Sequence, residues 1–353
     1  MSSVASTGSE PAGTPPPAPA SQGRWSTGGL GALRQVLLLK EGSIIVVTAI
    51  TIAYFAITTK HFFTVSSFKD LLPYFAPYAI TAAGQVWVMI NGEIDLSIGG
   101  TYLISPFIFW KFTEAGLPLI PAMLLALLVC AAVGVINGFF VSVVGISSFV
   151  TTLGTLFALS GLSLVISSST QINTPGVTIL GGGTFETIFG GGTYSELFWA
   201  LGIVIILQIA LSRTRWGVYT VAVGGNRLGA KEAGINEKAN IIRNFALCAL
   251  LAGFTGLLDA VRVGNVAPDP STSNEFLFQA ISAAVIGGTL LVGGYGTVVG
   301  ALIGALFLGV IYDGLIFKSV SSNYEFLYVG LAILIAMTIN IYIARIRTRS
   351  GLG

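Results

Sequence analysis

The chain has 353 residues, of which 54% are hydrophobic and 9% charged, with a formal net charge of +2. A soluble domain carries about 25% charged residues, so this composition excludes a soluble enzyme, a nucleic-acid-binding protein and a disordered chain. The long apolar runs are apolar on all faces, which favours membrane-spanning helices over a transmembrane barrel. We therefore expect an all-α fold, a polytopic helical membrane protein.

The first 42 residues are expected to lie outside the membrane domain. Residues 1–23 are rich in Ser, Pro, Ala, Gly and Thr, which predicts disorder because such a segment buries too little apolar area to offset its ordering entropy. Residues 24–42 favour a short amphipathic helix that approaches the membrane. The first long apolar run begins only near Ser43, so the N-terminal segment does not resemble a signal peptide.

Residues 43–345 are expected to form one transmembrane domain. A helix needs about 20 apolar residues to cross the hydrocarbon core. Ten runs fit this pattern, at 43–60, 71–90, 97–112, 118–143, 148–167, 196–212, 243–261, 276–292, 297–314 and 325–344. Crossings 2–5 and 7–10 have similar lengths and begin on opposite faces, which allows an inverted repeat of two four-helix units.

The placement of Lys and Arg predicts the orientation of these crossings. With both termini on one face, twelve of the 17 Lys and Arg residues fall on that face and five on the other. Basic residues are enriched on the cytoplasmic side of a membrane. We therefore expect both termini inside, with a cytoplasmic loop at 213–243, a basic cytoplasmic tail at 346–353 and an external loop at 168–195.

Several kinds of chemistry have no candidate residues in the sequence. No GxxxxGK[ST] motif occurs, so the chain is not expected to hydrolyse a nucleotide by that route. The one histidine, His61, lies at a predicted outer boundary and is interpreted as an interfacial polar residue. Cys130 and Cys248 lie inside apolar runs and are interpreted as buried hydrophobic residues, and no metal site is expected. The chain is therefore expected to be a transport component rather than an enzyme.

The segment INGEIDLSIGG at 90–100 places two acidic residues between apolar runs. Acidic groups at the membrane are costly unless they are paired, hydrated or capping. Asp95 precedes Ser97 by two residues and can cap the next helix, and Gly92 allows a sharp break in the chain. A cap and hinge formed by Gly92, Asp95 and Ser97 is one interpretation, and a direct contact with a solute or gate is the other.

The segment GGNRLGAKEAGIN at 224–236 lies in the basic inner loop. Asn226 can cap a short helix that Gly234 then ends. A short isolated helix on a cytoplasmic loop favours docking of a cytoplasmic subunit over a solvated turn. The docking residues are expected to be Asn226, Arg227, Ala230, Lys231, Glu232, Ala233 and Gly234.

Polar side chains near helix ends are the candidates for a solute path. SSFVTTLGT at 147–155 places several hydroxyls at the start of a helix, where they either line a path or bond back to their own helix. The candidate path residues are Asn91, Ser148, Phe149, Thr151 and Thr152. Gly296, Gly300 and Gly304 repeat every four residues, which indicates close helix packing rather than chemistry.

Five segments occur together in a specific order: INGEIDLSIGG, SFVTTLGT, RTRWG at 213–217, GGNRLGAKEAGI and AISAAVIGGTLLVGGYGTVVGALIGALFLGVI. In this order and spacing they resemble the membrane permease subunit of bacterial ABC importers for ribose, xylose, arabinose and related sugars. The resemblance covers about residues 40–345. Three features depart from the family pattern: Glu93 follows Gly92 where members often have Gly-Gly, the turn at 293–296 reads GGYG, and the N-terminal extension is unusual.

The resemblance implies about ten helices per subunit in the bacterial plasma (inner) membrane. It implies a pore between two permease subunits, expected to be a homodimer, with an external sugar-binding protein and a cytoplasmic ATPase that docks on the helix at 224–236. The chain itself would hold no cofactor, because ATP and Mg²⁺ bind to the ATPase, and no nucleic-acid partner is expected.

Two other functions remain open at this point. The same architecture could carry a nucleoside or polyol. A secondary transporter or channel without an ATPase would need its own coupling group near the midplane, and the candidates Asp259 and Asp313 both fall near predicted outer ends.

Overall fold

The computed structural model describes residues 41–60, 62–177, 183–192 and 194–320, together with 324, 327–331, 333–335, 337–338 and 342. The expected disordered segment at 1–23, almost all of the approach helix at 24–42, His61 and the basic tail at 346–353 lie outside the described residues.

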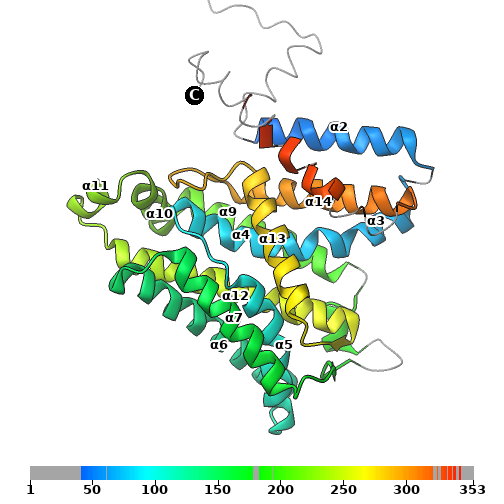
Figure 1. The fold of residues 1–353 in the computed structure, drawn as a ribbon, viewed down its shortest axis with the longest axis horizontal. Coiled ribbons are helices and arrows are strands. Elements are labelled where there is room, and N and C mark those ends of the chain that lie inside the picture. Colours follow the sequence, from blue (N-terminus) through cyan, green and yellow to red (C-terminus); the bar gives the residue numbers. More distant parts are fainter. Residues whose placement is uncertain are drawn as a thin grey trace, which may run out of the picture.

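The described part of the chain is a bundle of helices (Figure 1). In chain order the elements are α2 (Gly42–Thr58), α3 (Val65–Leu71), the 3-10 helix η1 (Leu72–Tyr74), α4 (Ala76–Ile90), α5 (Ile98–Glu114), α6 (Leu119–Phe139), the π-helix η2 (Phe140–Val144), α7 (Ser148–Ile166), β1 (Ile172–Asn173), α8 (Thr184–Ile188), α9 (Ser195–Arg213), α10 (Arg215–Gly225), α11 (Arg227–Glu232), α12 (Glu237–Val263), β2 (Asn265–Val266), α13 (Pro270–Ile286) and α14 (Val298–Phe317). The two short strands pair antiparallel, with Ile172 opposite Val266.

Each predicted crossing coincides with helical residues. The first nine match α2, α4, α5, α6 with η2, α7, α9, α12, α13 and α14, and helical residues between 327 and 338 lie in the tenth. Among the described residues, five helices are long and apolar enough to cross a membrane by themselves, namely Leu119–Val144, Ser148–Ser167, Ser195–Arg213, Glu237–Val263 and Val298–Phe317. The expected all-α class is confirmed.

The eighth crossing lies at a different position from the predicted run at 276–292. α13 begins earlier because Asp269 caps it, with its Oδ1 accepting a hydrogen bond from the Ser271 N–H at 2.8 Å, and because Pro270 occupies the first turn. It ends at Ile286, and the following chain turns at Gly288, whose φ is +94°. The loop 287–297 therefore separates α13 from α14, where the sequence suggested only a tight turn.

The segment at 213–243, expected to be a cytoplasmic loop, is largely helical. α10 fills its first part and begins at a Thr214 cap, whose hydroxyl accepts from the Gly217 N–H at 3.3 Å. α12 begins at Glu237 rather than near 243, because the Asn236 side chain accepts from the Ala239 N–H at 3.0 Å. Figure 1 shows α10 and α11 together at one end of the bundle, while α2 lies along α14 at its edge.

Glycines allow the closest helix contacts. A Cβ added to Gly134 of α6 would lie 2.3 Å from the Phe245 carbonyl oxygen of α12. A Cβ added to Gly304 of α14 would lie 2.1 Å from the Ala283 carbonyl oxygen of α13. The predicted packing role is therefore confirmed for Gly300 and Gly304, because only a residue without Cβ permits this approach. Gly296 lies in the loop before α14 rather than on the same helix face.

The two halves of the bundle pack reciprocally, as expected for two related four-helix units. α4 packs against α13 and α14, while α12 packs against α5 and α6. Residues 174 positions apart meet one another: the Thr81 and Thr255 hydroxyls lie 3.1 Å apart, and the Tyr102 and Phe276 rings stack with centroids 3.9 Å apart. The same separation of 174 residues in both contacts fits the inverted repeat suggested by the crossing pattern.

Candidate functional site

The short helix expected after Asn226 is present as α11. The Asn226 side-chain oxygen accepts from the Gly229 N–H at 2.9 Å, and Gly234 follows the helix with a φ of +81°. Of the six residues in α11 only Ala230 is buried. Lys231, Glu232 and Ala233 are exposed, so they form the outer surface at the end of α11.

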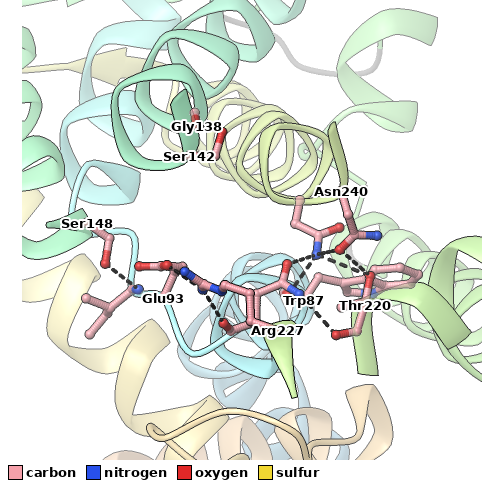
Figure 2. A network of polar contacts seen from close by, with 11 residues as sticks. Trp87, Glu93, Gly138, Ser142, Ser148, Thr220, Arg227 and Asn240 are labelled. Atoms are coloured by element: carbon pink, nitrogen blue, oxygen red, sulfur yellow. Dashed lines mark hydrogen bonds and ion pairs between the residues drawn. The ribbon is translucent and has the colours of Figure 1, made fainter. Parts of the chain in front are cut away.

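Arg227 turns inward from the start of α11 and contacts the acidic segment at 91–97. Its guanidinium donates to the Asn91 carbonyl at 3.1 Å and to Glu93 Oε1 at 2.8 Å (Figure 2). The Glu93 side chain is only 12% exposed, whereas that of Arg227 is 47% exposed. Sequence reasoning missed this ion pair, because the two residues lie 134 positions apart and neither segment carries a signal for the other.

Asn91 belongs to a buried polar network between α4, α10 and α12. Its side-chain nitrogen donates to the Thr220 carbonyl at 3.0 Å, and its side-chain oxygen accepts from Asn244. Asn244 also donates to the Trp87 carbonyl at 3.1 Å and accepts from the Trp216 indole N–H at 2.8 Å. Figure 2 shows Trp87, Thr220 and Asn240 close together at this network. The amide groups are therefore satisfied within the chain, which fixes the end of α4 against α10.

Three chain segments meet backbone to backbone beside this network. The Gly294 N–H donates to the Ile90 carbonyl at 2.8 Å. A Cβ added to Gly224 at the end of α10 would lie 1.7 Å from the same carbonyl oxygen, and one added to Gly293 would lie 2.8 Å from the Gly92 nitrogen. The glycine-rich turns seen in the sequence thus pack on one another. We call the residues Ile90, Gly92, Gly224, Gly293 and Gly294 the glycine junction.

Asp95 stabilises the turn before α5 in a way related to the expected cap. Its Oδ1 accepts from the Ser97 N–H at 2.9 Å and from the Ser97 hydroxyl at 2.6 Å. Ser97 rather than Asp95 directly precedes α5, and no side chain caps the first N–H groups of that helix. Burial raises the pKa of the Asp95 carboxyl to about 6, although the two hydrogen bonds from Ser97 act in the opposite direction.

Replacing Asp95 separates the hydrogen-bonding role from the charge. Asp95→Ala is expected to cost about 1–3 kcal/mol, because the buried Ser97 N–H loses its acceptor. Asp95→Asn keeps an oxygen acceptor and is expected to be milder. Because the pKa of Asp95 is raised in the folded state, the wild type loses stability as the pH rises through about 6. The difference in stability between the wild type and Asp95→Asn should therefore shift in favour of the wild type as the pH falls from about 7.5 to about 5. Thermal unfolding of the purified variants measures both effects, and equal losses for Ala and Asn would show that the site needs charge.

Two of the candidate path residues hold the acidic segment in place. The Ser148 hydroxyl accepts from the Ile94 N–H at 3.3 Å, and the Thr152 hydroxyl accepts from the Leu96 N–H at 3.0 Å. Thr152 also donates to the Ser148 carbonyl at 2.7 Å, which is a bond back to its own helix. Both side chains are buried, so their contacts tie the start of α7 to residues 94–96.

Asn137 of α6 extends these contacts and was not singled out as a site residue from the sequence. Its side-chain nitrogen donates to the Ser97 hydroxyl at 2.8 Å, and its side-chain oxygen accepts from the Thr155 hydroxyl at 2.7 Å. Phe149 differs from its neighbours, because its side chain points outward and is 53% exposed. Thr151, on the same helix, is partly buried.

Comparison with known proteins identifies the class. Residues 67–338 match the family described as "Branched-chain amino acid transport system / permease component". The chain belongs to this family and is a multi-pass membrane transport component rather than an enzyme. No solved structure shows a significant match to the chain.

Curated relatives cover nearly the same region. The ribose import permease protein of Escherichia coli (strain K12) is 31% identical over 86% of this chain and 94% of its own length. The xylose/arabinose import permease protein of Sulfolobus acidocaldarius is 31% identical over 86% of each chain. A probable ABC transporter permease protein of Sinorhizobium fredii is 32% identical over 78% of this chain and 81% of its own length.

Proposed function

We propose that the chain is the membrane-spanning permease subunit of an ABC importer for a sugar. The observation that carries the proposal is the similarity, over most of both chains, to import permeases for ribose and for xylose/arabinose. The energy comes from ATP hydrolysis on a partner ATPase, which binds ATP and Mg²⁺, and the sugar is delivered by an external binding protein. The full transporter contains two copies of this chain.

The basic inner loop at 213–243 faces the cytoplasm in this proposal. Both termini lie on the same side of the plasma membrane, and the loop at 168–195 faces the binding protein. The exposed residues of α11 contact the ATPase, with Lys231 and Glu232 at the rim and Ala233 between the proteins. The buried Ala230 supports α11 from within.

The sugar path runs along the exposed face at the start of α7. Phe149 provides an aromatic surface that is 53% exposed. The hydroxyl oxygen of Thr151 on the same helix is buried and has no hydrogen-bond partner among the described residues, so it lies behind this surface. Ser148 and Thr152 support this region from behind, because their side chains are buried and bonded to residues 94 and 96. Asn91 is buried in the polar network with Thr220 and Asn244 instead. A weakly polar path suits a neutral solute that the permease must release, since a bare charge in a narrow pore is costly.

Cysteine labelling tests this path. In the assembled transporter, Phe149→Cys is expected to react with an impermeant thiol reagent in at least one nucleotide state, whereas Thr152→Cys stays unreactive because its site is buried. The natural Cys130 and Cys248 are buried, so the background is expected to be low. If Phe149→Cys reacts in no nucleotide state, the path runs elsewhere in the bundle.

Transport in proteoliposomes tests the function itself. The permease is reconstituted with an ATPase and a binding protein encoded beside it, and uptake of ribose, xylose and arabinose is measured with and without ATP. ATP-dependent uptake of a sugar supports the proposal. Uptake of only a nucleoside, a polyol or a branched-chain amino acid would assign another solute to the same machinery, and uptake without the ATPase would indicate a secondary transporter.

A further inference from the structure

We propose that the ion pair between Arg227 and Glu93 is a positioning contact that fixes α11 to the segment 91–97, so that a displacement of α11 moves the start of α7. The inference rests on the proposed function, because it assumes that α11 receives the ATPase. It assigns an inward-facing role to Arg227 and a role in coupling to Glu93.

Apart from this ion pair, α11 has few contacts that hold it to the bundle. It has six residues, and only Ala230 is buried. A single small apolar side chain buries little area, so hydrophobic packing alone holds α11 weakly. The Arg227 guanidinium adds two contacts in one direction, to the Asn91 carbonyl at 3.1 Å and to the Glu93 carboxylate at 2.8 Å. Both hydrogen bonds come from the same guanidinium nitrogen, Nη2, and the one to Glu93 is charge-assisted. Together they fix the first residue of α11 relative to the end of α4.

The segment 91–97, which Arg227 contacts, is itself hydrogen-bonded to α7. The residue after Glu93, Ile94, donates its N–H to Ser148 at 3.3 Å, and Leu96 donates its N–H to Thr152 at 3.0 Å. Figure 2 shows Glu93 between Arg227 and Ser148. A continuous series of polar contacts therefore joins α11 to α7 through four consecutive residues of one backbone segment, next to the exposed Phe149.

The ion pair is partly shielded from solvent, with Glu93 12% and Arg227 47% exposed, so it is sensitive to salt but not fully solvated. Such a pair contributes modestly, which suits a contact that must follow a moving helix.

A double-mutant cycle on the reconstituted transporter tests the proposal. Glu93→Gln and Arg227→Gln are each expected to lower the amount of sugar transported per ATP hydrolysed by about two- to five-fold. The double variant should be no worse than Arg227→Gln alone, because both changes remove the same contact. Lys238→Gln is the matched control, since it removes an exposed charge from the same loop and should transport as the wild type does.

A second measurement needs no transport. In the purified permease, Glu93→Gln should raise the rate of trypsin cleavage after the exposed Lys231 by about the same factor, because α11 detaches more often. Normal coupling and normal cleavage in Glu93→Gln would overturn the proposal, as would losses that simply add in the double variant. Failure of the proposed function would give a different result. If α11 does not dock the ATPase, Ala233→Trp leaves coupling intact, whereas Glu93→Gln still speeds trypsin cleavage after Lys231.

Discussion

Ala233→Trp is expected to lower ATP-driven uptake by more than about tenfold while the variant still inserts and folds. Ala233 is exposed at the end of α11, so the indole does not disturb the packing of the permease itself. It would instead separate two surfaces that fit closely, and a loss of shape complementarity at the centre of an interface costs several kcal/mol. Uptake and ATP hydrolysis are measured on the same proteoliposomes, and hydrolysis should continue without transport.

Two further variants define what this result means. Lys238→Trp places the same side chain on an exposed position beyond α11 and should leave transport unchanged. Ala230→Trp changes a residue that is 5% exposed, so it is expected to destabilise the permease rather than uncouple it. Normal transport by Ala233→Trp would show that α11 is not the docking helix.

The local structure could be predicted from the sequence because its signals are local. Asn226 and Gly234 predicted both ends of α11, and runs of apolar residues located the crossings. A second local signal explains the boundary that was predicted wrongly: the Asp269–Pro270–Ser271 sequence begins α13, six residues before the predicted apolar run at 276–292. α10 was not predicted, because residues 213–243 were assigned as a cytoplasmic loop.

The contacts that join distant segments could not be predicted in this way. Arg227 and Glu93 are charged residues in polar loops, and either could have faced water. The Asn91 amide reaches Thr220 across 129 positions and Asn244 across 153. The sequence contains no period or spacing that specifies such partners, since they depend on which helices the bundle brings together. The roles expected for Ser148 and Thr152 therefore remain predictions, although their observed bonds favour support of the 94–96 segment.

The glycine junction should be the most sensitive part of the chain to a small substitution. Gly224→Ala adds one carbon atom, which would lie 1.7 Å from the Ile90 carbonyl oxygen and 2.8 Å from the Gly294 nitrogen. Cβ is fixed to the backbone and both neighbours are backbone atoms, so no change of rotamer relieves the overlap. The Ile90 carbonyl also cannot move away freely, because it accepts the Gly294 N–H at 2.8 Å.

Gly224→Ala is therefore expected to destabilise the permease by about 3 kcal/mol or more, the upper range for overpacking, and to reduce its yield in membranes sharply. Gly225→Ala is the matched control one residue further on, where an added Cβ has nothing within 4 Å. That variant should unfold at the wild-type temperature or slightly above it, since alanine favours the helical backbone over glycine. Both are compared by the fraction of protein that stays monodisperse after heating in detergent. Equal melting of the two variants would mean that α10 and α4 do not meet through Gly224, and the arrangement of α10 beside the end of α4 would then be incorrect.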